Sequence, residues 1–76
     1  MGMSKLRKWR KTRQLAQFEV ARMLGTSIAN VCRIELGQQW PSAELMAEIE
    51  RMTRRQVTAS DIMQTCIEAK NGEHRL

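Results

Sequence analysis

The stretch QFEVARMLGTSIANVCRIELG, residues 17–37, decides the fold that this sequence predicts. Apolar residues recur at three- and four-residue spacing on both sides of Gly25, which is typical of two short amphipathic helices. Only Gly25, Thr26 and Ser27 separate these helices, and a three-residue turn containing glycine makes the sharp corner of a helix-turn-helix. Ala21 leaves room for the helices to cross closely. The apolar side chains predicted to pack beneath this turn and hold the two helices together are Val20, Leu24, Val31 and Ile34.

The rest of the chain also has helical spacing. Aromatic residues are few and β-branched residues do not alternate, which disfavours strands. Further helices are expected over 4–13, after Pro41, and from a capping-box-like start at 58–61. We therefore predict a compact, all-α, five-helix domain over residues 1–68, followed by a fraying polar C-terminal tail over 69–76. The expected core also includes Leu6, Trp9, Leu15, Ala21, Leu45, Ile49, Met52, Val57 and Ile62.

Positive charge is concentrated in the first half of the chain. The 76 residues carry a formal net charge of +5. Residues 1–40 hold eight basic and two acidic side chains, whereas residues 41–76 hold five and six. Six of the basic residues lie between Lys5 and Arg13. This distribution suits a polyanionic partner, although a basic helix that merely faces solvent has the same composition.

The sequence offers little for catalysis or for metal binding. His74 is the only histidine, and no paired-carboxylate cleft, phosphate-binding glycine loop or catalytic triad is apparent. Cys32 and Cys66 lack metal-ligand spacing, and we interpret them as free thiols in a reducing cytoplasm. No apolar run reaches the ~20 residues of a membrane span. We therefore expect a cytoplasmic protein that is not an enzyme and has no metal, cofactor, small-molecule ligand or membrane partner.

The segment LRKWRKTRQLAQFEVARMLGTSIANVCRIELGQQWPSAELMAEIERM resembles the Cro/phage-repressor (XRE-type) helix-turn-helix family. Leu6–Arg10 is similar to the first helix of that family, and Ile34–Gly37 is similar to its exit from the third helix. Pro41–Leu45 and Val57–Met63 are similar to the starts of its fourth and fifth helices. The resemblance extends over residues 6–63 and implies a lambda-repressor-like domain that binds double-stranded DNA.

The resemblance also implies a recognition helix over residues 27–36, which would lie in the major groove. Arg33 can pair with guanine through two hydrogen bonds, whereas Ile28 and Ala29 can pack on thymine methyl groups. The implied base-contacting residues are Ser27, Ile28, Ala29 and Arg33. The implied phosphate-contacting residues are Lys11, Arg13, Gln17, Asn30, Gln38 and Gln39.

Other positions follow or depart from the pattern of this family. Arg10 and Glu35 match a basic residue of helix one and an acidic residue that ends helix three, and we interpret them as a partly buried structural pair. Ala16 stands where Ser or Thr usually caps helix two, and Gln14 stands at a turn position that is often Gly. With Val31 and Ile34 inward, the outward side of helix three comprises Ala29, Cys32, Arg33 and Leu36.

We predict a sequence-specific DNA-binding transcriptional regulator, a Cro-like repressor that binds a pseudo-palindromic operator as a homodimer. Met63, Cys66 and Ile67 offer a dimer surface, although their spacing also fits a core stripe. A different function stays open, namely an antitoxin or adaptor whose main role is to bind a protein. Such a protein would use Phe18, Trp40 and the tail as its contact surface.

Overall fold

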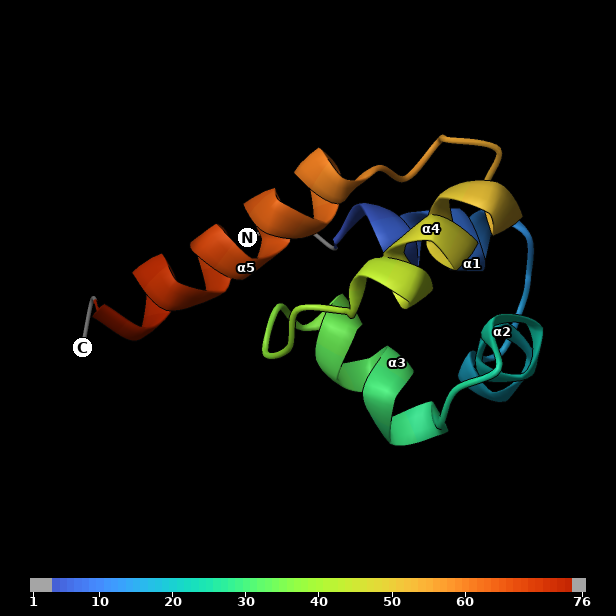
Figure 1. Ribbon diagram of the computed structural model, residues 1–76. Helices are drawn as coiled ribbons and strands as arrows, with labels where there is room; N and C mark the ends of the chain where they lie inside the picture. The colour runs from blue at the N-terminus through green and yellow to red at the C-terminus, as the bar shows by residue number, and fades with distance from the viewer. Residues whose placement is uncertain (1–3, 75–76) are drawn as a thin grey trace.

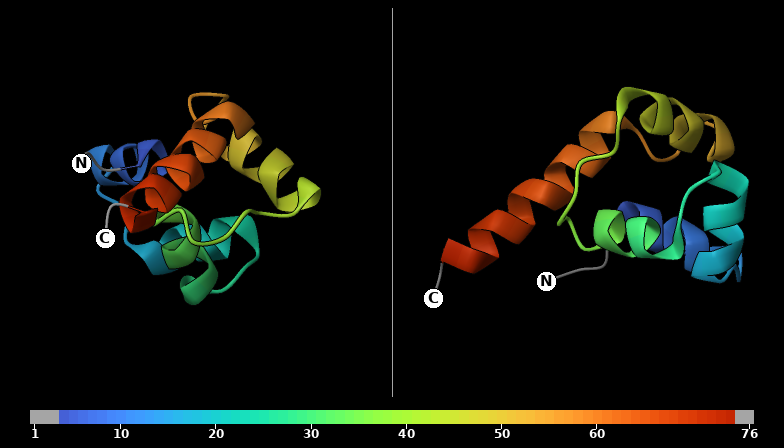
Figure 2. Two further views of the ribbon diagram at one scale, coloured as in Figure 1. Left: turned by 90° about the vertical axis from the view of Figure 1, so that its left-hand side faces the viewer. Right: turned by 60° about the horizontal axis from the view of Figure 1, so that its bottom comes forward.

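Residues 4–74, which the computed structural model describes, form five helices and contain no strand (Figure 1). The helices are α1 Lys5–Thr12, α2 Gln17–Leu24, α3 Ile28–Glu35, α4 Ala43–Met52 and α5 Ala59–His74. The predicted all-α, five-helix architecture is confirmed. The first four helices and the start of α5 form a compact body, and the C-terminal half of α5 extends beyond it (Figure 1, Figure 2).

Side chains at the helix starts explain why the helices begin where they do. Ser4, Ser27 and Ser42 precede α1, α3 and α4, and each hydroxyl accepts a hydrogen bond from the backbone N–H three residues later, at 3.1–3.2 Å. These bonds satisfy N–H groups that have no partner inside the helix. Ala16 precedes α2 and has no side-chain oxygen, so it cannot accept such a hydrogen bond, as we expected from the sequence. Instead, the Ala16 N–H donates to the Glu19 carboxylate at 2.8 Å, which is half of a capping box.

The buried core agrees with most of the prediction but differs along α4. Every predicted core residue is buried except three. Leu15, Leu45 and Met52 are the exceptions, because they are only partly buried at the edge of the core. Met46, which was not predicted, is buried in their place, with Ile49 one turn further along. The buried line of α4 therefore passes through Met46 rather than through Leu45 and Met52.

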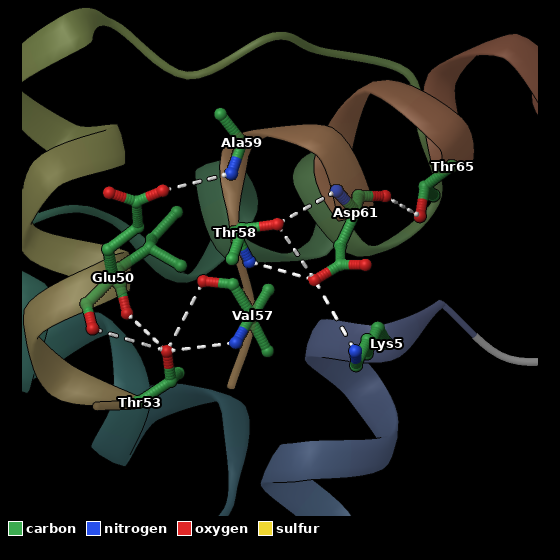
Figure 3. A network of polar contacts seen from close by, with 9 residues as sticks. Lys5, Glu50, Thr53, Val57, Thr58, Ala59, Asp61 and Thr65 are labelled. Carbon is green, nitrogen blue, oxygen red and sulfur yellow. Dashed lines mark hydrogen bonds and ion pairs between the residues drawn. The ribbon is translucent and has the colours of Figure 1, made fainter. Parts of the chain in front are cut away.

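Thr53, directly after the last residue of α4, is buried although its side chain is polar. This threonine is fully buried, and its hydroxyl donates to the Ile49 carbonyl at 2.8 Å and accepts from the Val57 N–H at 3.2 Å (Figure 3). Because both hydrogen-bonding roles are used, burying this polar group costs little. The sequence pattern missed Thr53 because hydrophobic periodicity takes no account of a satisfied hydroxyl.

The start of α5 is tied to α4 and to α1 by carboxylates (Figure 3). Asp61 accepts from the Thr58 N–H at 2.9 Å, which is the capping-box pattern expected from the sequence. This backbone hydrogen bond, helped by the Thr58 hydroxyl and the Lys5 ammonium, holds the pKa of Asp61 below its usual range. Glu50 of α4 accepts from the Ala59 N–H at 3.1 Å. These polar contacts therefore fix the start of α5 against α4 and α1.

The polar segment predicted as a fraying tail is helical as far as the structure describes it. α5 continues through residues 69–74, and the remaining two residues of that segment lie outside the described range. Ala69 is half-buried because it lies against the loop at Gly37. Hydrophobic spacing ends near Ile67, but the backbone hydrogen bonds of a helix do not require apolar side chains.

Two glycines adopt left-handed backbone conformations for different reasons. Gly25 has φ +71° and Gly37 has φ +75°, a region that favours glycine. A Cβ atom at Gly25 would meet no atom within 4 Å. A Cβ atom at Gly37 would lie 2.6 Å from the carbonyl oxygen of Thr65 in α5. The loop after α3 therefore touches the α5 backbone at a point where only glycine fits.

The two glycines give a matched test of this contact. Gly25→Ala should cost about 1–2 kcal/mol, which is the backbone cost of a left-handed alanine alone. Gly37→Ala should cost at least about 1 kcal/mol more, because a backbone carbonyl cannot move aside as a flexible side chain can. Thermal unfolding monitored by circular dichroism measures both. Equal losses for the two variants would show that the loop and α5 are not in contact.

Candidate nucleic-acid interface

The corner between α2 and α3 is built from backbone hydrogen bonds around Gly25. The Gly25 N–H donates to the Arg22 carbonyl at 3.2 Å, and the Thr26 N–H donates to the Ala21 carbonyl at 2.9 Å. These two bonds around a left-handed glycine are the Schellman arrangement that ends a helix sharply. Ala21 is buried in the corner. Three residues, 25–27, therefore suffice to turn the chain from α2 into α3.

The outer side of α3 is exposed and mostly apolar. Val31 and Ile34 are fully buried beneath the helix, as predicted. On the opposite side, Ile28 is 52% exposed and Leu36, directly after the helix, is 49% exposed. Exposed Ala29 and Arg33 and half-buried Cys32 complete this outer face, which we define as residues 28, 29, 32, 33 and 36.

A buried ion pair fixes α3 to α1. The structure brings Arg10 and Glu35 together through two hydrogen bonds, from Arg10 Nε at 2.7 Å and from Nη2 at 3.1 Å. Their side chains are only 10% and 2% exposed. Arg10 also donates to the Leu15 carbonyl at 2.9 Å. The hydrogen bond to Glu35 raises the pKa of Arg10 despite its burial.

Three of the six residues expected to contact phosphate are engaged within the protein. The Gln17 amide donates to Glu35 at 3.2 Å and so extends the ion pair to the start of α2. Asn30 donates to the Thr26 hydroxyl at 2.8 Å and accepts from the Gln39 amide. Gln17, Asn30 and Gln39 therefore support the position of α3 through hydrogen bonds within the protein.

The other three expected phosphate ligands are exposed. Lys11 and Gln38 both face solvent. Arg13 is also exposed, and its guanidinium carbon lies 4.7 Å from the centre of the Trp9 ring, where the cation is attracted to the aromatic face. Lys11, Arg13 and Gln38 thus keep donors free for a ligand.

A shallow hollow of about 480 Å³ joins the basic side of α1 to the outer face of α3. Arg7 and Lys11 line it on one side, and Cys32 and Leu36 line it on the other. The start of α2 completes the wall, with Arg10 and Glu35 at the base. Sequence reasoning missed Arg7. Its spacing of four residues from Lys11, on the same helix side, is the signal that identifies it.

Several exposed apolar side chains lie outside this hollow. Phe18 on α2 and Trp40 in the loop before α4 are both about half exposed, and the Arg22 guanidinium carbon lies 5.9 Å from the centre of the Phe18 ring. On α5, Met63 and Ile67 are exposed one helical turn apart. Contiguous apolar patches are typical of contact sites for macromolecules, and Met63 and Ile67 are close enough on α5 to form a small one.

The comparisons with known proteins add no relationship. No family model matches the chain, and neither the curated proteins nor the solved structures give a significant match.

Within the described residues, no group of His, Cys, Asp and Glu side chains is arranged to hold a metal ion. No helix in the same range is long and apolar enough to cross a membrane.

The buried ion pair leads to a stability prediction. Arg10→Met should destabilise the fold by about 3–5 kcal/mol, because Glu35 would be left charged and buried without its partner. Arg7→Met should change stability by less than about 1 kcal/mol, because Arg7 has no ion-pair partner among the described residues. Denaturant unfolding measures both. The double variant Arg10→Met/Glu35→Leu should recover much of the loss, and a double variant no more stable than Arg10→Met would contradict this account.

Proposed function

We propose that the chain is a sequence-specific DNA-binding transcriptional regulator of the helix-turn-helix class. The observation that carries this proposal is the hollow between α1 and α3, where Arg7 and Lys11 stand beside the outer face. DNA binding requires cations for the phosphate backbone and a protruding element for the base edges. The proposal is supported by the position of these cations beside an exposed side of α3.

In the proposed complex, α3 lies in the major groove with its N-terminal end closest to the bases. Ser27, Ile28 and Ala29 would face base edges in the first turn, and Arg33 would follow one turn later. The exposed guanidinium of Arg33 can donate two hydrogen bonds to guanine O6 and N7. The sharp corner at Gly25 supports this docking, because it leaves α2 free to cross the DNA backbone.

The proposed phosphate contacts come from Lys11, Arg13, Gln38 and Arg7. The first three are exposed, and Arg7 is half-buried at the rim of the hollow. In the proposed complex, Gln17 contributes indirectly. Its amide donates a hydrogen bond to Glu35 and so orients the carboxylate that holds Arg10. These contacts would attract any duplex and set the register of α3 without reading sequence.

The proposed activity is repression by occupancy, in a homodimer that binds a pseudo-palindromic operator. A two-fold dimer places two recognition helices ~34 Å apart, one turn of DNA. Exposed Met63 and Ile67 on α5 support a self-contact through this helix, because α5 extends beyond the body where a second copy can approach it (Figure 2). The exposed Phe18 and Trp40 favour the second candidate, an adaptor or antitoxin that binds a protein.

Salt dependence separates these two candidates. The affinity for a mixed-sequence duplex, measured by fluorescence anisotropy, should fall steeply as salt rises, because phosphate binding releases counterions. Lys11→Ala should reduce the slope of log affinity against log salt by about 1. No binding to any duplex at low salt would rule out the regulator and favour the adaptor.

The control for this experiment is an exposed arginine on another side of the molecule. Arg54 lies in the connection between α4 and α5, which stands on the opposite side of the body from the start of α3 (Figure 1, Figure 2). Arg54→Ala removes the same charge as Lys11→Ala and should leave the slope unchanged. An equal reduction in both variants would indicate a diffuse charge effect rather than a phosphate contact.

The dimer is tested by a charge placed on α5. Wild-type protein should sediment as a dimer at micromolar concentration in the presence of a palindromic duplex, and Ile67→Glu should sediment as a monomer because it buries an unpaired carboxylate. Glu68→Lys, a charge change at an exposed position on another side of α5, should stay dimeric. A wild-type protein that is monomeric both with and without duplex would exclude the dimer.

A further inference from the structure

The polar side chains around the start of α3 are largely occupied by internal hydrogen bonds. The Ser27 hydroxyl oxygen accepts from the Asn30 N–H at 3.1 Å as the helix cap, which uses one of its two lone pairs. The Asn30 amide is bound at both ends, to the Thr26 hydroxyl and to the Gln39 amide. A half-buried asparagine held in this way cannot turn toward an adenine edge without losing two hydrogen bonds.

The side chains of the outer face are apolar, with one exception. Ile28, Ala29 and Leu36 are exposed, and Cys32 is half-buried between them. Their spacing places them on one side of α3, opposite the fully buried Val31. The exception is Arg33, whose described contacts include no ion pair. The outer face is therefore a methyl-rich surface that carries one cation.

Only one feature of the major groove matches an apolar side chain. The 5-methyl group of thymine projects into the groove, and cytosine lacks it. Ile28 and Ala29 lie in the first turn of α3, the part that reaches base edges in this docking mode. Two apolar residues there can distinguish a 5-methylpyrimidine from cytosine, but they cannot replace hydrogen bonds to adenine or guanine.

We infer that this chain recognises 5-methylpyrimidines, chiefly thymine, through Ile28 and Ala29, and that Arg33 supplies the hydrogen-bonded base contact of the outer face in each half-site. This inference rests on the proposed function and adds a basis for specificity to it. It predicts half-sites in which adjacent thymines lie near one guanine. Methyl contacts, rather than polar side chains, then carry most of the sequence discrimination.

The test begins with a selection from a random duplex pool that contains thymine. The best selected duplex is then synthesised again with deoxyuridine in place of each thymine in turn, which removes one methyl group and leaves base pairing intact. Affinity should fall roughly fourfold for each contacted methyl, the fold-change expected for one buried methyl-sized group. Ile28→Ala should abolish the effect at one thymine position and keep it at others.

Met23→Ala is the matched control, because it truncates another exposed apolar residue on the neighbouring helix α2. It should preserve the full loss at every deoxyuridine position, which separates a methyl contact from a change in DNA shape. Equal affinity for thymine and deoxyuridine duplexes in the wild type would overturn the inference and leave the proposed function standing. A selection that enriches no duplex would overturn the proposed function and the inference with it.

Discussion

The buried ion pair between Arg10 and Glu35 is the constraint on which the candidate site depends. It joins the last turn of α1 to the end of α3, and Gln17 adds the start of α2 to the same carboxylate. Removing one partner of such a pair is far more costly than replacing both with apolar groups, so the pair fixes an orientation more than it adds stability. Because α3 is held against α1, the basic side of α1 and the outer face of α3 border one hollow.

Most of the fold follows from local rules that can be read in the sequence. Serines before α1, α3 and α4 and the glycine after α2 set helix ends through bonds that depend only on near neighbours. Helical spacing then identifies Val20, Val31, Ile34 and Ile49 as core, and all four are fully buried. The Arg10 and Glu35 pair also follows from their positions, through the family resemblance rather than through spacing.

The remainder depends on contacts between distant residues, which spacing does not specify. Met46 rather than Leu45 lies on the buried line of α4, which continues through Ile49 to Thr53. Asn30 lies on a helix expected to face a ligand, yet Gln39, nine residues later, binds its amide. Such pairings change the candidate site itself. They occupy polar groups that lie beside the outer face, whereas a sequence pattern can only count these groups as available.

The central claim is that the outer face of α3 and the basic side of α1 together bind duplex DNA. The most direct measurement is a titration of ¹⁵N-labelled protein with a mixed-sequence duplex at low salt, followed by amide chemical shifts. The account predicts that the largest shifts fall on residues 28–33, at the start of α2 and near Lys11, and that the connection between α4 and α5 does not change. Shifts confined to the surroundings of Phe18, Trp40 and α5, or no shifts at all, would contradict it.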